Sequence, residues 1–232
     1  MSSPTTRRDR QRENTLAEIK AAAWADMSRS GSVDVSLRGV AREMGMAVSA
    51  LYRYFPSRED LITALVVDTF DSLTARLRQS FDSAPADLAP IDLFVRVGTA
   101  YREWALADPL QYRLAFASPI GDYTGTDVTT AASNRSSGVL LEVMARAVDT
   151  GRVDHDRVDR LLTPDLRVAL ERWSSYLPRP LPTTALGAAL ISYAALHGAI
   201  NLELNRHLPP MVRSNAALFE ATLRQSVQGL LH

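Results

Sequence analysis

One guanidinium, that of Arg53, stands between the phenols of Tyr52 and Tyr54 in a short segment with helical spacing. Successive residues lie about 100° apart around a helix, so a helix that turns Leu51 and Phe55 toward a core turns Arg53 outward. A guanidinium can donate to guanine O6 and N7 or to a phosphate, and phenols suit phosphate oxygens. Because the major groove of duplex DNA admits an α-helix, these residue types at this spacing predict a surface that reads DNA.

The segments on either side would hold this surface in place. Ser36 is placed to cap a short helix, which Gly45 ends, and two short helices joined by a tight glycine turn form a helix-turn-helix. A long helix starts after Ser57, with Asp60 three residues later in an acidic form of the capping box. Arg58 lies in the first turn of that helix, where free N–H groups also favour phosphate.

The outward and flanking positions of the second short helix, together with the starts of the helices on either side of it, supply the candidate DNA contacts. These residues are Ser36, Arg38, Val48, Ser49, Ala50, Tyr52, Arg53, Tyr54 and Arg58. Each also has a plainer interpretation, with the tyrosines as packing residues and the arginines as solvated surface groups. The first dozen residues add four arginines against one aspartate. This basic arm, expected to be flexible over residues 1–11, suits phosphate or the minor groove.

The run from Ser36 to Leu61 resembles the DNA-binding domain of the TetR family of regulators. It contains the family pattern Leu-Tyr-x-(His/Tyr)-Phe-x-x-(Lys/Arg)-x-x-Leu, which begins at Leu51, and the opening (Thr/Ser)-x-x-x-(Val/Ile)-Ala, which begins at Ser36. The resemblance covers residues 12–62. The chain departs from the family at the turn, where Ala47 replaces the serine that caps the recognition helix, and the lost cap costs about 1 kcal/mol.

The rest of the chain has helical spacing and no sustained strand alternation. The expected fold is all-α, with a three-helix helix-turn-helix DNA-binding domain at 12–62 and, as the resemblance implies, a helical effector-binding and dimerisation domain at 63–232. The segment from Ser118 to Gly138 is rich in Gly, Ser, Thr and Asp and is expected to be a mobile loop. After that loop, helices are expected at about 139–149, 164–176, 183–206 and 214–231.

The C-terminal part resembles one TetR subfamily that carries a Trp-x-x-x-His-Gly pattern, with Tyr193 here in place of the tryptophan. Ligand pockets between helices are lined mainly by apolar and aromatic side chains with a few polar anchors. The candidate effector pocket consists of Tyr101, Trp104, Tyr112, Phe116, Trp173, Tyr193, His197 and Asn201. The alternative is that these aromatic residues are ordinary core and that His197 is a hydrogen-bonded core group.

The last two expected helices supply a candidate dimer face. Small residues such as Gly187 and Gly198 would allow close helix approach. One side of the first helix carries Leu190, Ala194, His197 and Asn201, and a stripe on the last helix consists of Phe219, Leu223, Val227 and Leu230. Two such helices from each subunit would form a four-helix bundle, as the two-fold DNA binding of the family implies. The alternative is that both faces are buried within one chain.

The composition and motifs exclude several other classes. The chain has no cysteine, which excludes disulfides, thiolate zinc sites and a cysteine nucleophile, and no phosphate loop or dinucleotide fingerprint is present. An all-α enzyme would have to use Asp154-His155-Asp156, or His197 with Glu203. Neither set has a recognised metal or catalytic spacing, so no enzyme, metal or cofactor is expected.

The longest apolar stretch, 185–200, is shorter than the roughly 20 residues of a membrane span, so a cytoplasmic protein with no membrane partner is expected. The leading hypothesis is a homodimeric repressor that binds a palindromic DNA operator and is released by a small, largely apolar effector. The alternative is a DNA-binding regulator without such an effector, acting through a partner protein or as an activator.

Overall fold

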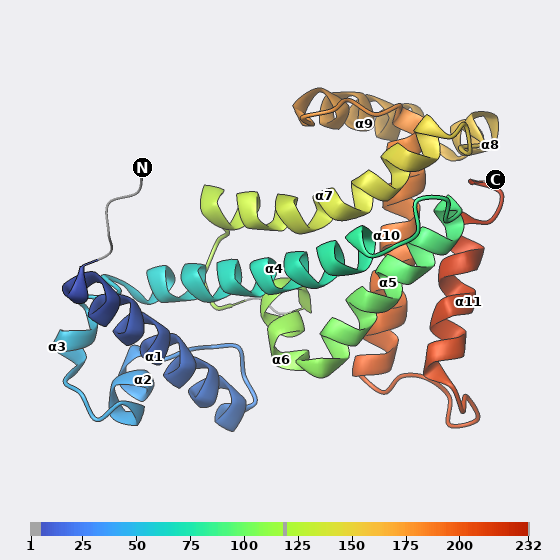
Figure 1. The fold of residues 1–232 in the computed structure, drawn as a ribbon. Helices are drawn as coiled ribbons and strands as arrows, with labels where there is room; N and C mark the ends of the chain where they lie inside the picture. The colour runs from blue at the N-terminus through green and yellow to red at the C-terminus, as the bar shows by residue number, and fades with distance from the viewer. Residues whose placement is uncertain (1–5, 118–119, 232) are drawn as a thin grey trace. The chain divides into compact units, whose positions relative to one another are not determined.

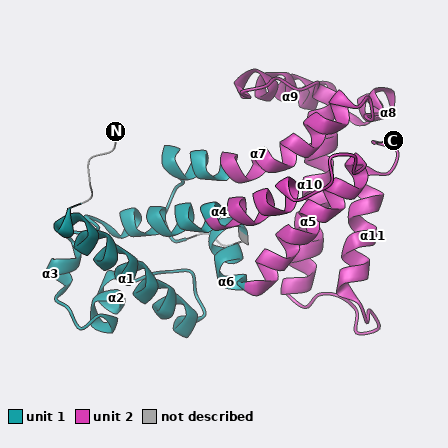
Figure 2. Ribbon diagram, in the orientation of Figure 1, with its two compact units in different colours: residues 1–71, 108–133 teal, residues 72–107, 134–232 magenta. Residues whose placement is uncertain are grey.

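The computed structural model describes residues 6–117 and 120–231, and among these no residue lies in a β-strand. The all-α prediction is therefore confirmed. The chain divides into two compact units, which Figure 2 shows in different colours. Unit 1 contains residues 1–71 and 108–133, and unit 2 contains residues 72–107 and 134–232.

Unit 1 contains the helix-turn-helix domain predicted at 12–62, called the head below, and several later segments of the chain. Its elements are α1 (Arg7–Ser30), α2 (Leu37–Glu43), α3 (Val48–Leu51), the first part of α4 (Arg58–Asp82), α6 (Pro109–Tyr112), a π-helix (Arg113–Ala117) and the start of α7 (Asp127–Asp149) (Figure 1). Thr6 and Asp9 form a capping box at the start of α1. Residues 7–11 are therefore helical, and the prediction of a flexible arm is wrong for that stretch.

The helix-turn-helix forms where the glycine and cap signals predict it. Ser36 Oγ accepts from Gly39 N at 3.3 Å, and Gly45 has φ +64° in the turn after α2, a conformation that costs glycine little. The structured helix α3 ends at Leu51, and Tyr52 to Tyr54 continue as a turn rather than as helix. Pro56 disfavours helical geometry at the residue before it, which accounts for the short helix.

Replacing Ala47 by serine should raise the free energy of unfolding by about 1 kcal/mol. The backbone at Ala47 already has the extended conformation of an N-cap residue (φ −68°, ψ 140°), and its side chain makes no cap hydrogen bond. A serine Oγ at this position can accept from the first N–H groups of α3, and urea unfolding measures the gain. Ala47→Val offers no acceptor, so an equal gain from valine would show that capping is not the cause.

One hydrophobic cluster joins the head to the later segments of unit 1. Leu51 and Phe55, which the helical spacing predicts to face the core, are buried in this cluster together with Val40. Leu114 and Ile120 belong to the same cluster. The predicted domain boundary at residue 62 is therefore not a boundary of the hydrophobic core, because residues 108–133 contribute side chains to the core of the head.

Unit 2 is built around one long apolar helix. Its elements are the end of α4, α5 (Pro90–Ala107), most of α7, α8 (His155–Leu161), α9 (Pro164–Tyr176), α10 (Thr183–Leu204) and α11 (Asn215–Val227). Within this unit α10 contacts α5, α8, α9 and α11 (Figure 1). By length and composition alone α10 could cross a membrane, but these contacts identify it as the central helix of a packed bundle.

The expected loop at 118–138 is wrong for residues 127–138, which form the first half of α7. Thr126 and Thr129 cap this helix reciprocally, since each backbone N–H donates to the side-chain oxygen of the other. Thr129, Ala132 and Ser136 are buried at helical spacing. The small polar residues that suggested a loop are thus one face of a helix, and residues 118–119 lie outside the described part of the chain.

Candidate nucleic-acid interface and ligand sites

The recognition surface of unit 1 has the side-chain directions that helical geometry predicts. Ser49, Tyr52 and Arg53 are exposed, whereas Val48 and Ala50 are half-buried on its flanks. Arg53 has no ion-pair partner among the described residues. The guanidinium is therefore available to an external acceptor.

Helix α2 adds two cations next to this surface. Arg38 and Arg42 are both exposed, and residues four apart lie on one face of a helix. Neither has an ion pair within the described ranges, and α2 contacts α3 directly. Arg38 is among the residues predicted to contact DNA and Arg42 is not, although its four-residue spacing from Arg38 on a short helix could have identified it.

Tyr54 connects the recognition segment to the start of α1. Its ring lies 5.5 Å from the Arg12 guanidinium carbon in a cation–π contact, and it also packs against the hydrophobic cluster. The basic residues Arg7, Arg8 and Arg12 are exposed on α1. The basic N-terminal residues 7–12 are thus part of helix α1, and Arg12 of this helix contacts the recognition segment at Tyr54.

Arg58 is held by contacts within the protein. Its Nε donates to the carbonyl oxygen of Val35 at 2.9 Å, and its guanidinium pairs with Asp34. These two residues come directly before Ser36, the cap of α2. Arg58 therefore fixes the start of α2, and the phosphate contact predicted for it stays a prediction.

The candidate effector residues divide between the two units. In unit 2, Tyr101 and His197 share a hydrogen bond of 3.0 Å, and the Tyr193 ring lies 4.3 Å from the His197 ring. Trp104 packs edge-on against Tyr101. Asn201 donates to the carbonyl oxygen of His197 at 2.9 Å. These side chains pack on one another between α5 and α10.

The other three candidates lie elsewhere. Tyr112 and Phe116 belong to unit 1, where Phe116 meets Phe70 edge-on at 5.4 Å between ring centroids. Trp173 is half-buried on α9. The eight residues are therefore divided between the two units, and the effector pocket expected from them stays a prediction.

Burial changes the titration of this aromatic cluster. Burial raises the pKa of the Tyr193 phenol and lowers the pKa of His197 from its ordinary 6.5 to about 4. His197 is thus neutral in the folded protein at neutral pH. A neutral imidazole suits its place against two phenol rings.

Stability should fall as the pH drops from about 6.5 to about 4, in part because of His197. In that window the unfolded chain binds a proton at His197 that the folded chain does not, so acid favours unfolding. With about 1.4 kcal/mol for each unit of pKa difference, the loss reaches a few kcal/mol near pH 4. Urea unfolding at several pH values should show a shallower decline for His197→Gln, and parallel curves would contradict this assignment.

The groups considered for catalysis have structural partners. The Asp154 carboxylate caps α8 by accepting from Arg157 N at 2.9 Å, and His155 Nδ1 lies 2.6 Å from the Thr184 hydroxyl. Glu203 accepts two bonds from the Arg102 guanidinium, at 2.6 and 2.7 Å. Within the described ranges no group of three His, Asp or Glu residues could hold a metal ion.

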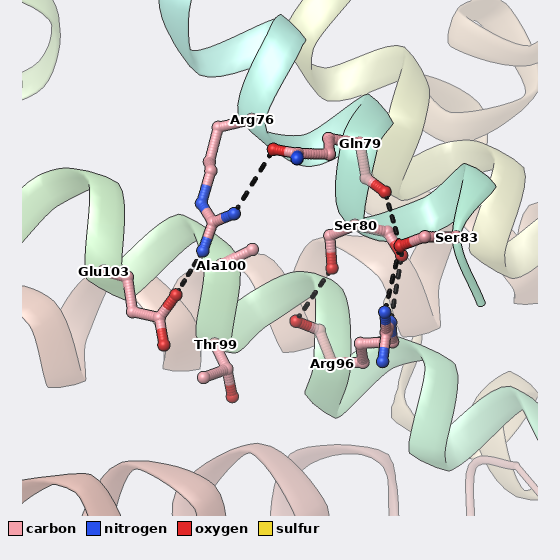
Figure 3. Close-up of a pocket in the computed structure, with 8 residues that line it drawn as sticks. All are labelled: Arg76, Gln79, Ser80, Ser83, Arg96, Thr99, Ala100 and Glu103. Carbon is pink, nitrogen blue, oxygen red and sulfur yellow. Dashed lines mark hydrogen bonds and ion pairs between the residues drawn. The ribbon is translucent and has the colours of Figure 1, made fainter.

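A polar groove of about 450 Å³ lies between the end of α4 and α5 (Figure 3). Arg76 pairs with Glu103 across it. Arg96 donates to the Ser80 carbonyl and to the Ser83 hydroxyl, both at 3.0 Å. Its charged groups bind other groups of the protein, so the groove is best described as the polar seam between two helices.

The comparisons with known proteins agree with this geometry. Residues 94–226 match the family model described as "Tetracyclin repressor-like, C-terminal domain", and residues 19–65 match "Bacterial regulatory proteins, tetR family". Neither description mentions a Trp-x-x-x-His-Gly pattern, so that subfamily assignment stays a prediction.

Three similar proteins each match almost the whole chain. The HTH-type transcriptional regulator Rv1816 of Mycobacterium tuberculosis is 28% identical over 222 residues, which is 94% of this chain and 92% of that protein. The crystal structure of the regulatory protein SCO4313 is 31% identical, with a TM-score of 0.78, and the match covers 96% of this chain and all of that one. A Rhodococcus structure of unknown function shares the fold at 21% identity and a TM-score of 0.69, over 94% of this chain and 95% of that one.

These similarities favour a transcriptional regulator over the alternative of an all-α enzyme. The match to the C-terminal model covers more than half of the chain, and the helix-turn-helix lies within the N-terminal match. The chain therefore belongs to the TetR family of DNA-binding transcriptional regulators.

Proposed function

We propose that this protein is a homodimeric cytoplasmic repressor that binds a near-palindromic operator and leaves it when a small effector binds. The observation that carries the proposal is the exposed cationic surface of Arg38, Arg42 and Arg53, none of which has an ion pair among the described residues. Two such surfaces in a dimer would read half-sites about one helical turn apart. Serine, tyrosine and arginine side chains around them suit phosphate oxygens.

Selection of fragments of the source genome with the purified protein tests the proposal. An enriched palindrome with a half-site spacing of about one helical turn is the expected result. Salt-sensitive binding without any enriched sequence would contradict a specific operator. A reporter gene placed behind the enriched site then separates repression from activation.

The dimer is proposed to form through the outer face of α10 and α11. The predicted stripe of Phe219, Leu223 and Val227 is buried within the chain, so it is not the dimer face. Other apolar residues of these helices are at least 40% exposed, namely Leu190, Leu202 and Leu218. Leu202 and Leu218 line one groove together with Gly198, and a side chain added at Gly198 would meet open space.

Replacing Gly198 by arginine should convert the dimer to a monomer, weakening association on the order of 100-fold or more, because an unpaired charge would be buried twice in a symmetric interface. Sedimentation equilibrium measures the effect. Gly138→Arg on α7 is the matched control, because a side chain there also meets open space. A dimer that survives Gly198→Arg unchanged would remove this face from the interface.

A further inference from the structure

A second pocket lies entirely within unit 1, close to the DNA-reading head. It has a volume of about 340 Å³ and is formed by α4, the π-helix, and the segment that leads into α7. Its apolar wall includes Val66, Phe70, Leu114 and Ile120. The volume lies at the lower end of the range typical of small-molecule pockets.

The lining of this pocket selects one class of ligand. None of its lining residues is charged. The lining also includes four hydroxyl-bearing residues, Tyr123, Thr129, Thr130 and Ser133, and the Tyr123 hydroxyl lies 3.1 Å from that of Thr63 on α4. An ionised ligand would lose its hydration without gaining a counter-charge. The pocket therefore suits a small uncharged molecule with an apolar body and a hydrogen-bonding group.

The apolar wall of the pocket is also part of the core of the head. Val66, Phe70, Leu114 and Ile120 belong to the same hydrophobic cluster as Leu51 of the recognition helix. Protein cores are close-packed and transmit displacement. A ligand inserted against this wall would therefore press on the core that supports α3.

A second contact leads from the pocket to α2. Gly121 follows the wall residue Ile120 and lies next to the Arg58 guanidinium. A Cβ added at Gly121 would be in van der Waals contact with an Arg58 nitrogen, at 3.6 Å. Arg58 in turn holds Val35 by a hydrogen bond and Asp34 by an ion pair. Displacement of the pocket wall would therefore reach the start of α2 through Arg58 as well as through the shared core, which includes Leu37 and Val40.

We propose that this pocket is the effector site, that it takes a small uncharged and largely apolar molecule, and that Arg58 couples it to the helix-turn-helix. The inference rests on the proposed repressor function. It assigns the effector to unit 1 rather than to the Tyr101–His197 cluster of unit 2, where the aromatic side chains pack on one another. The effector releases DNA only to the extent that it binds the released state more tightly than the DNA-bound state.

N-phenyl-1-naphthylamine is a suitable probe, because it is uncharged, apolar, carries one N–H donor and becomes fluorescent in apolar surroundings. Thr130→Trp would block the pocket from an exposed position. Ala131→Trp, at the next and also exposed position of α7, is the matched control. We expect the wild type and Ala131→Trp to bind the probe alike and Thr130→Trp to bind it at least about 10-fold more weakly. Equal binding by all three proteins, or by none, would overturn the site.

Operator affinity, measured by fluorescence anisotropy with and without the probe, tests the coupling. The probe should weaken operator binding of the wild type and not of Thr130→Trp. In Arg58→Lys the probe should bind as in the wild type while its effect on operator affinity becomes smaller, and an undiminished effect would overturn the role of Arg58. If the probe does not bind the pocket but the protein binds its operator, the effector site is wrong and the proposed repressor function is unaffected. If the protein binds no operator, the proposed function itself is wrong.

Discussion

Replacing Arg53 by alanine is expected to lower operator affinity by about 30-fold to about 25,000-fold. A good bidentate contact from arginine to a base contributes about 1–3 kcal/mol, and a two-fold dimer loses it twice. Arg53 is exposed on the recognition segment and has no ion pair among the described residues, so its removal should leave the fold intact. Fluorescence anisotropy on the enriched operator measures the loss, and unchanged urea unfolding confirms the fold.

Two comparisons show which kind of contact Arg53 makes. Arg160→Ala removes an exposed positive charge from α8 of unit 2 and should bind the operator like the wild type. A base contact predicts relaxed specificity at one position of each half-site, whereas a phosphate contact predicts a uniform loss and a salt slope smaller by about one for each arginine. Affinity equal to that of the wild type would remove Arg53 from the interface.

Periodic and capping signals predicted most of the helices because they depend on near neighbours in the sequence. The cap at Ser36 and the positive φ of Gly45 need only local geometry, and both were predictable. Composition misled over 127–138, because small polar residues are frequent in loops. In this chain Thr129 and Ser136 instead occupy the buried face of a helix.

The candidate sites depended on contacts between distant segments, which spacing cannot supply. Arg58 was predicted to face phosphate from its place in a helix, but its partners Val35 and Asp34 come from more than twenty residues earlier. Tyr101 and Tyr112 lie close in sequence and belong to different units. The exposure of Arg53 could be predicted, although Arg53 lies in the turn after α3, because it depends only on how the short segment with Leu51 and Phe55 packs on one core.

Replacing Glu203 by alanine is expected to lower the free energy of unfolding by about 3 kcal/mol or more, the largest stability loss predicted for a single substitution in this chain. The Arg102 and Glu203 side chains are only 13% and 11% exposed, and their bidentate pair joins α5 to α10. Arg102 also lies over the Phe219 ring of α11, with 5.7 Å from its guanidinium carbon to the ring centroid. Without Glu203, this guanidinium would stay mostly buried without its counter-charge.

Two controls distinguish a buried charge from a lost contact. Asp149→Ala breaks the ion pair of Asp149 with Arg179, in which both side chains are more than half exposed, and should change the free energy of unfolding little, because water screens exposed pairs. The double variant Arg102→Leu with Glu203→Leu removes both charges and should recover most of the stability, since apolar replacements of buried pairs are often neutral or stabilising. Urea unfolding at one fixed protein concentration is the measurement, because the apparent stability of a dimer depends on concentration. A loss from Glu203→Ala no larger than that from Asp149→Ala would mean that water reaches Arg102, and that the pair does not hold the three helices together.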